Sequence, residues 1–225
     1  MPSAMTDQCR LYLITPPVIA DLSRFVETLK AALSGGDVAC LQLRLKSREG
    51  VSASDEEILR AAEKIAPLLR AADAHFLIND RPDLAKRAGA DGAHIGQKDA
   101  AYAEARAVLG AGATIGVTCH NSFDLAIEAG EAGADYVAFG AFFPTRTKEA
   151  PLRADVSLIE NWSFATTVPC VAIGGVTADN CGVLVAAGAD FIAVSSAVWD
   201  AAEGPEAAVR RLNKAILEAH SNRHD

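Results

Sequence analysis

Three polar side chains alternate with apolar ones at the end of an apolar segment, in the order Gln42-Leu43-Arg44-Leu45-Lys46. Residues two apart on a β-strand point to the same side, so Gln42, Arg44 and Lys46 would share one face. A guanidinium offers a planar fork of donors and an ammonium offers a point charge, and both suit a diphosphate. The alternation favours an anion-binding strand end over a solvated end with ordinary surface cations.

Two carboxylates, Asp80 and Asp99, follow two further apolar segments. If those segments are neighbouring strands, the loops after them bring the carboxylates together. Mg²⁺ typically takes one or two carboxylates together with phosphate oxygens. We therefore predict that Asp80 and Asp99 bind Mg²⁺, although either aspartate alone would equally suit a turn or a helix N-cap.

Small residues that suit a second anion follow the last two apolar segments, as Gly174-Gly175 and Ser195-Ser196. Glycine lets the backbone approach a ligand closely, and backbone N–H groups can hold a phosphate there. A Gly-Gly pair can also be an ordinary turn. Its place after the seventh of eight segments favours a phosphate site.

Other reactive side chains lack obvious partners. His120 could act as a general acid or base, or it could cap the following helix or pack against a loop. Cys119 has no obvious activating pair beside it, and no Ser–His–Asp order, HExxH motif or Walker loop is present. The residues point to binding and charge stabilisation.

Eight short apolar segments must position these groups, at residues 11–15, 39–44, 75–79, 92–96, 114–118, 136–140, 169–174 and 191–195. Helical stretches lie between most of them, for example at 22–33, 55–72, 102–109 and 122–132. Buried strands that alternate with helices predict a parallel sheet. Eight units predict a single (β/α)₈ TIM barrel with its active site at the C-terminal strand ends. A doubly wound open sheet is the alternative.

One domain is expected over residues 1–225, with a core from about 10 to 218 and short polar tails. Within it Ala-Gly-Ala-Asp recurs at residues 88–91, 132–135 and 187–190. Each copy follows a helical stretch and precedes an apolar segment. We interpret it as a helix C-cap that leads into a strand, with its aspartate away from the catalytic end.

Composition restricts the function classes. The formal net charge of −8 disfavours a non-specific nucleic-acid or membrane-surface binder, and we expect neither partner. The five scattered cysteines form no CxxC pair and are typical of reduced thiols. No apolar run reaches the length of a membrane span, and the first ten residues lack a signal-peptide core. We therefore expect a cytoplasmic protein, and the sequence carries no signal for an oligomeric state.

Several motifs together resemble thiamine-phosphate synthase, also called thiamine-phosphate pyrophosphorylase, from about residue 11 to 199. Besides residues 42–46 they are Asn79-Asp80-Arg81, His94-Ile95-Gly96-Gln97-Lys98-Asp99, Gly116-Val117-Thr118-Cys119-His120, Pro144-Thr145-Arg146-Thr147-Lys148 and Ile173-Gly174-Gly175. The family joins a hydroxymethylpyrimidine diphosphate to a thiazole phosphate carboxylate. The resemblance implies that thiamine phosphate, pyrophosphate and carbon dioxide are formed.

The resemblance also implies roles for single residues. The pyrimidine diphosphate would be held by Gln42, Leu43, Arg44, Leu45, Lys46, Asn79, Thr118 and Lys148, of which Arg44, Thr118 and Lys148 would be catalytic. The thiazole phosphate would be held by Thr145, Arg146, Thr147, Gly175, Ser195 and Ser196. Asp80 and Asp99 would bind Mg²⁺.

The family reaction is dissociative, so the pyrimidine C–O bond breaks before the thiazole nitrogen attacks. Cations would then stabilise the departing pyrophosphate. The segment 145–155 has no clear periodicity, and we expect it to close over the substrates as a loop.

The sequence departs from the family pattern at Lys98, where an acidic residue is usual, and at Thr118, where serine is frequent. Lys98 would either weaken Mg²⁺ binding or point away from the metal. Arg146 falls at a variable position.

Two rival functions remain open at this point. A thiazole tautomerase of the same superfamily would use His120 and would need neither a metal nor a diphosphate site. A catalytically silent barrel could bind a phosphorylated ligand. The Asp80/Asp99 pair beside residues 42–46 favours the synthase over both rivals.

Overall fold

A closed barrel of eight parallel strands forms the centre of the computed structural model, which describes residues 8–47, 49–145 and 153–221. Each strand pairs with the next, and β8 returns to pair with β1. The strands are β1 (Arg10–Ile14), β2 (Cys40–Leu43), β3 (His75–Asn79), β4 (Gly92–Ile95), β5 (Thr114–His120), β6 (Tyr136–Gly140), β7 (Cys170–Ile173) and β8 (Phe191–Val194). The predicted (β/α)₈ barrel is therefore confirmed, and the open sheet is excluded.

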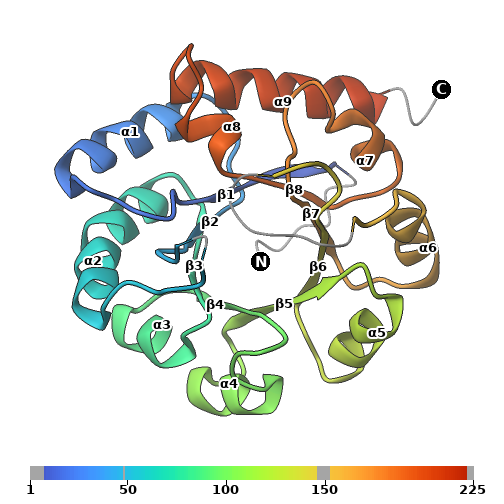
Figure 1. Ribbon diagram of the computed structural model, residues 1–225, viewed down its shortest axis with the longest axis horizontal. Helices are drawn as coiled ribbons and strands as arrows, with labels where there is room; N and C mark the ends of the chain where they lie inside the picture. Colours follow the sequence, from blue (N-terminus) through green and yellow to red (C-terminus); the bar gives the residue numbers. More distant parts are fainter. Residues whose placement is uncertain (1–7, 48, 146–152, 222–225) are drawn as a thin grey trace.

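Helices form a ring outside the strands (Figure 1). They are α1 (Leu22–Ser34), α2 (Asp55–Ala71), α3 (Pro82–Ala88), α4 (Tyr102–Leu109), α5 (Phe123–Glu131), α6 (Ser157–Ala165), α7 (Gly182–Ala186), α8 (Ser196–Trp199) and α9 (Pro205–Ser221). Local signals explain several boundaries: Ser54 and Glu57 form a capping box at α2, and Pro82 begins α3. The short α8 sits between β8 and α9, where barrels of this class often carry an extra helix.

The strands separate two apolar layers, because alternate side chains point in opposite directions. An outer layer between strands and helices contains Leu11, Leu13, Leu41 and Leu43. A smaller inner layer fills the barrel with Tyr12, Ile14, Ala39, Cys40, Leu77, Tyr136, Ala138, Val171, Phe191 and Ala193. The barrel interior is thus a packed core, and a ligand must bind at its mouth.

The repeated Ala-Gly-Ala-Asp junction clamps pairs of strands together at the N-terminal end of the barrel. Its three glycines have φ values of 62°, 99° and 105°, as a left-handed C-cap requires. The Asp91 carboxylate accepts a hydrogen bond from Phe76 N–H at 2.8 Å, and Asp91 N–H donates to the Phe76 carbonyl at 2.8 Å.

Asp135 and Asp190 repeat this two-point contact with Ile115 and Cys170, through carboxylate contacts of 2.7 Å in both cases. The interpretation of these aspartates as structural is confirmed.

Most boundaries lie close to their predicted positions. Strands 75–79 and 136–140 and the helix 102–109 were predicted to the residue. β5 was predicted to end at 118 but runs to His120, where its pairing with β6 shifts register by one residue. The predicted extent of the domain, residues 1–225, stays a prediction.

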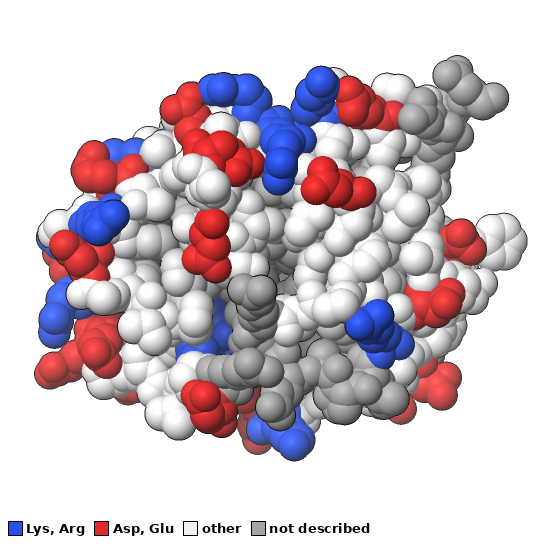
Figure 2. Space-filling model, turned by 45° about the horizontal axis from the view of Figure 1, so that its top comes forward, with Lys and Arg blue, Asp and Glu red and all other residues white. Residues whose placement is uncertain are grey.

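Charge on the surface is mixed. Figure 2 shows acidic and basic side chains interspersed over one face, without a broad basic stripe. Among the helices of the described residues, none is both long and apolar enough to cross a membrane.

Candidate active site

Two cationic side chains, Arg44 and Lys46, follow the carboxyl end of β2 at the mouth of the barrel. The Arg44 side chain is partly buried, and its Nη1 donates to the Lys46 carbonyl at 3.1 Å. Leu43 and Leu45 are buried in the outer layer instead, so the predicted alternation is present. The side chains of Leu43 and Leu45, two predicted substrate-binding residues, therefore face the helices. They could contact a substrate at the mouth only through their backbone atoms.

A short turn beyond β2 holds Lys46 over β3. Lys46 forms an antiparallel bridge with Ser52, and its Nζ lies 2.6 Å from Asp80 Oδ2. Burial lowers the pKa of Arg44, although the charges of Asp80 and Asp99 act against this shift. Two cations and two carboxylates from β2, β3 and β4 therefore share one environment.

Asp80 and Asp99 lie within hydrogen-bonding reach of each other after the neighbouring strands β3 and β4, as predicted. Asp80 N–H donates to the His94 carbonyl at 2.7 Å, and Asp80 has a φ of 61°, which is uncommon for a residue with a side chain. Asp99 Oδ2 accepts from Gly96 N–H at 2.9 Å.

The two carboxylates differ in pKa because Lys46 is bonded to Asp80, whereas Asp99 is set against the charge of Asp80. Burial acts to raise the pKa of Asp80, but the hydrogen bond from Lys46 and the contact with Asp99 outweigh burial, so this pKa falls below its ordinary value. Burial and the neighbouring Asp80 raise the pKa of Asp99. Two carboxylates in one place repel each other, and a divalent cation between them would relieve that repulsion.

This donor set fits Mg²⁺. Within the described ranges no group of three or more His, Cys, Asp or Glu side chains could hold a metal ion. A site with two carboxylates leaves the other positions to phosphate oxygens and water, which is the usual arrangement for Mg²⁺ bound with a phosphorylated substrate. Lys98, the departure from the family pattern, is exposed.

The second predicted anion cluster lies after β7 and β8. Gly175 has a φ of 67°, and a Cβ there would lie 2.3 Å from the Pro144 carbonyl oxygen. The glycine is therefore required for close packing of the β7–α7 turn on the segment after β6. This packing brings the turn next to Thr145, another predicted member of the cluster. Ser196 is exposed at the start of α8.

Thr15 joins the two clusters, and the sequence analysis did not identify it. The Thr15 side chain is fully buried, and its Oγ1 accepts from Arg44 N–H at 2.9 Å. The Thr15 carbonyl accepts from Ser195 Oγ at 3.2 Å. The Ser195 hydroxyl therefore holds the end of β8 to the end of β1.

A chain of hydrogen bonds crosses the barrel interior below the mouth. At one end, Gln42 Nε2 donates to Asn79 Oδ1 at 2.6 Å, and Tyr12 OH donates to Gln42 Oε1 at 3.2 Å. The hydroxyls of Tyr12 and Tyr136 lie 3.0 Å apart.

The same chain continues from Tyr136 to the end of β5. His94 Nδ1 lies 2.8 Å from Tyr136 OH, and His94 Nε2 lies 2.7 Å from Thr118 Oγ1. The two ends of this interior chain, Asn79 and Thr118, are half-buried, whereas its middle members are buried. Three predicted pyrimidine-binding residues, Gln42, Asn79 and Thr118, are therefore connected to one another.

Tyr12, His94 and Tyr136 were not among the predicted site residues. One sequence signal was Gly116 in the middle of an apolar strand, because glycine inside a strand often marks a close approach. A Cβ on Gly116 would lie 2.3 Å from the Tyr136 hydroxyl oxygen. Because glycine has no Cβ, Gly116 leaves room for the Tyr136 ring and hydroxyl at the centre of this chain of hydrogen bonds.

Cys119 and His120 are not arranged as a nucleophile and base. Cys119 is buried, and burial raises the pKa of its thiol to about 12, so the thiol stays neutral near neutral pH. His120 is exposed with a φ of 53°. The cap of α5 is Ser122, which accepts from Leu125 N–H at 3.2 Å.

Three predicted site residues, Arg146, Thr147 and Lys148, lie outside the described residues, as does most of the predicted closing loop.

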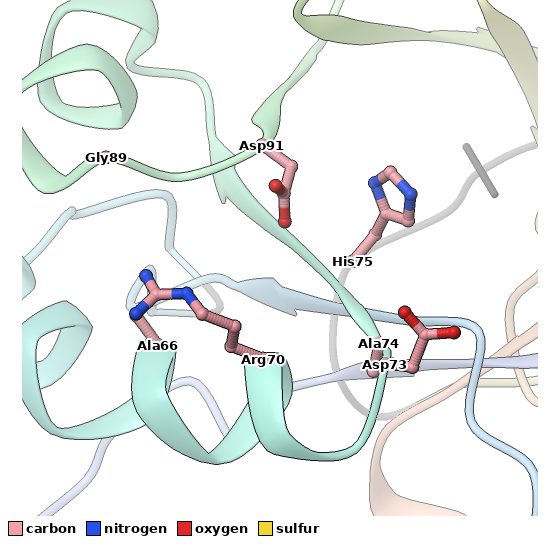
Figure 3. A pocket seen from close by; sticks show the side chains of 7 residues that line it. All are labelled: Ala66, Arg70, Asp73, Ala74, His75, Gly89 and Asp91. Carbon is pink, nitrogen blue, oxygen red and sulfur yellow. The ribbon is translucent and has the colours of Figure 1, made fainter.

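A small cavity of about 150 Å³ lies at the opposite end of the barrel, around the start of β3 (Figure 3). Arg70, Asp73, His75 and Asp91 contribute its polar side chains. His75 begins the strand that Asn79 ends, so this cavity is separated from the mouth by the length of β3. The cavity therefore lies at the N-terminal end of the barrel, where Asp91, Asp135 and Asp190 hydrogen-bond to neighbouring strands; we call these three contacts the aspartate clamps.

The family model for thiamine monophosphate synthase matches residues 11–198. Among curated proteins, the thiamine-phosphate synthase of Rhodospirillum centenum is 57% identical over 212 residues, which cover 94% of this chain and 99% of the relative. The thiamine-phosphate synthase of Hyphomonas neptunium is 52% identical over 212 residues, which cover 93% of this chain and 94% of that relative.

Among solved structures, the thiamine phosphate pyrophosphorylase of Pyrococcus furiosus is similar with a TM-score of 0.81 and 31% sequence identity. The match covers 96% of this chain and 99% of that chain. Similarity therefore extends through both predicted anion clusters and the interior chain that lies below them.

Proposed function

The chain belongs to the thiamine monophosphate synthase family and is a transferase that forms thiamine phosphate with release of pyrophosphate, and we propose that the mouth of its barrel performs this reaction. Its substrates are a phosphorylated pyrimidine and a phosphorylated thiazole. We propose that the pyrimidine carries its diphosphate on a hydroxymethyl group, and that a carboxylated thiazole phosphate also loses carbon dioxide.

One observation carries the assignment of the site. Two cations, Arg44 and Lys46, lie beside two carboxylates, Asp80 and Asp99, at the ends of three neighbouring strands. A diphosphate with a divalent cation needs both signs of charge in one place. An isomerase that acts without a diphosphate has no use for this combination.

Asp80 and Asp99 would hold Mg²⁺ in this site. When bound, the ion would neutralise charge on the diphosphate oxygens and so make pyrophosphate a better leaving group. The Lys46–Asp80 ion pair of 2.6 Å supports a role for Lys46 as a neighbouring cation that can turn to the same diphosphate.

The chain's own residues would favour cleavage of the pyrimidine C–O bond before the thiazole nitrogen attacks. Negative charge grows on the leaving diphosphate as this bond breaks, and Arg44 and Lys46 would be most strongly attracted to it at that point. Asn79 and Thr118 would orient the pyrimidine. No protein nucleophile is required, which agrees with the neutral, buried thiol of Cys119.

The thiazole phosphate would bind on the other side of the mouth. Backbone N–H groups of Gly175 and Ser196 would hold it there, with Thr145 on the neighbouring segment after β6. Thr15 fixes the distance between this cluster and Arg44. Arg146 and Thr147 would complete this phosphate site, and Lys148 would approach the leaving diphosphate from the predicted closing loop.

We propose that the protein works in the cytoplasm on small molecules, without a nucleic-acid or membrane partner. All five cysteines are free and buried, which fits a reducing compartment. The acidic net charge of −8 supports the absence of a nucleic-acid partner.

Three assays on the purified chain test the function. With both substrates and Mg²⁺ we expect thiamine phosphate and pyrophosphate to form, and excess chelator to stop the reaction. Isomerisation of the thiazole phosphate alone would instead indicate a tautomerase. Tight binding of either substrate with no turnover would indicate a silent barrel, and either of these two results would contradict the proposal.

A further inference from the structure

The interior chain from Asn79 to Thr118 can be assigned a direction of hydrogen bonding, one bond at a time. Tyr12 donates to Gln42 Oε1, so the Tyr12 oxygen must accept from Tyr136. The Tyr136 proton is then used, and His94 Nδ1 must donate to Tyr136. A neutral imidazole carries one donor and one acceptor, so His94 Nε2 accepts the Thr118 hydroxyl proton.

The opposite end of the interior chain has the complementary polarity. Gln42 Nε2 donates to Asn79 Oδ1, so the Asn79 amide nitrogen and its two hydrogens are left for the mouth of the barrel. Thr118 has given its proton to His94 and presents lone pairs to the mouth. The interior chain therefore offers a donor at Asn79 and an acceptor at Thr118.

We propose that this direction determines which pyrimidine the enzyme accepts, with Thr118 Oγ1 taking a hydrogen bond from the exocyclic amino group of the substrate. Tyr136 and His94 are then positioning residues, because they act on the substrate through Thr118. This inference rests on the proposed function, in which Asn79 and Thr118 contact the pyrimidine diphosphate.

As long as His94 is neutral, only one other order satisfies every member of the interior chain, and it is the complete reverse. In that order Asn79 turns its carbonyl oxygen toward the mouth and Thr118 becomes a donor. A diphosphate can only accept hydrogen bonds, so an anion near Asn79 disfavours the reversed order. The anion site on one side of the mouth thereby sets the acceptor character of Thr118 on the other side.

Because the middle of the interior chain is buried, the direction of each hydrogen bond fixes the direction of the next. Tyr12 is 1% exposed and Tyr136 is fully buried, so water has little access to repair a mismatched hydrogen bond. Reversal of a single bond would leave a buried donor or acceptor without a partner, which is costly. The members must therefore reverse together or not at all.

The direction can be measured without any substrate. In ¹⁵N NMR of the imidazole rings, assigned with a His94→Asn variant, we expect wild-type His94 to be protonated on Nδ1 and unprotonated on Nε2. Protonation on Nε2, or on both nitrogens, would overturn the assigned direction. This result stands whether or not the chain makes thiamine phosphate.

The specificity can be measured by binding in the absence of the thiazole substrate. We compare the pyrimidine diphosphate with the analogue in which a carbonyl oxygen replaces the amino group. Wild type is expected to bind the amino compound about 10- to 100-fold more tightly, since the analogue leaves the Thr118 acceptor unpaired.

Tyr136→Phe breaks the interior chain at its centre and frees His94 Nδ1, so the preference should fall to within about threefold. The KM for the pyrimidine diphosphate should rise while kcat changes little. Tyr102→Phe is the matched control, because Tyr102 lies on α4 and its hydroxyl donates to the Gly133 carbonyl. That variant should keep the full preference.

An unchanged preference in folded Tyr136→Phe would contradict the proposal. If that variant fails to fold, Thr118→Val at the half-buried end of the interior chain serves instead. It removes the acceptor at nearly constant shape, and a preference that survives in Thr118→Val would overturn the proposal equally.

Discussion

Single side chains account for the charge balance of the site, and the pair of Asp80 and Asp99 shows this most directly. Lys46 and the contact with Asp99 lower the pKa of Asp80, against its burial, while burial and Asp80 raise the pKa of Asp99. The two carboxylates therefore lie in one place although they repel each other. A divalent ion bound between them would relieve that repulsion.

Asp99→Asn should raise the Mg²⁺ concentration for half-maximal activity by about 10- to 100-fold, because one of two carboxylate ligands is lost. A titration of activity with Mg²⁺ measures this shift. Asp83→Asn is the control, since Asp83 lies in α3, three residues after Asp80, but pairs with Arg81 at 2.7 Å. An unchanged Mg²⁺ requirement in Asp99→Asn would remove Asp99 from the metal site.

Ser196→Asp should separate the two anion sites. Ser196 is exposed at the start of α8, so a carboxylate can be accommodated there and would repel a phosphate bound nearby. Steady-state kinetics should show a larger rise in KM for the thiazole phosphate than for the pyrimidine diphosphate. Equal increases would mean that the two phosphates are assigned to the wrong clusters.

Several site residues could be predicted singly because their types are unusual at the end of an apolar strand. Gln42, Arg44, Asp80 and Asp99 are polar or charged where a buried strand stops. Tyr12 and Tyr136 gave no such signal, because a tyrosine within an apolar strand is ordinarily part of the core. Their shared role follows from the contact of 3.0 Å between their hydroxyls, which the structure shows.

At the scale of elements, the aspartate clamps contribute stability at the end opposite the site. Asp91→Ala removes the acceptor for Phe76 N–H and should lower the free energy of unfolding by about 1–3 kcal/mol. Urea denaturation measures this loss, with the exposed Glu128→Ala on α5 as a control. KM values should stay near wild type, and a large KM change without loss of stability would contradict a purely structural role.

The segment between β6 and α6 carries the remaining predicted cation. Lys148→Ala should lower kcat by about 10²- to 10³-fold, the usual cost of losing one preorganised electrostatic contact in a transition state. KM should change less, because the charge matters most once the leaving group has become more negative. Single-turnover kinetics would expose an unaffected chemical step, which would exclude Lys148 from catalysis.

Element types were predictable because buried parallel strands and amphipathic helices leave different periodicities. Strands 75–79 and 136–140 have clear ends, since Asp80 follows the first directly and the second ends at Gly140. The extension of β5 to His120 was not predictable, because the register shift beside Thr118 depends on how β6 packs against it. The residues around Thr118 do not by themselves indicate how β5 pairs with β6.

At the scale of the whole molecule, closure of the barrel creates the relations between sites. Thr15, directly after β1, links Arg44 after β2 with Ser195 after β8, and this link exists only because β8 pairs with β1. The interior chain likewise joins residues of β1, β2, β3, β4, β5 and β6. Such relations span up to 180 positions in the sequence and follow from topology.

The proposed dissociative route would depend on the assembled mouth, and it predicts a substituent effect. An electron-withdrawing group on the pyrimidine destabilises the cation that forms when the C–O bond breaks. Turnover should therefore slow, while binding of the diphosphate changes little. Faster turnover with such a substrate would mean that the thiazole nitrogen attacks before the bond has broken.

We propose that one barrel mouth with two anion clusters joins two phosphorylated substrates. The most direct measurement is the ratio of thiamine phosphate formed to pyrophosphate released by the purified chain with both substrates and Mg²⁺. We expect equal amounts of the two products, and neither product when one substrate is omitted. Pyrophosphate released from the pyrimidine alone at the full rate, or thiazole turnover without pyrophosphate, would contradict the proposal.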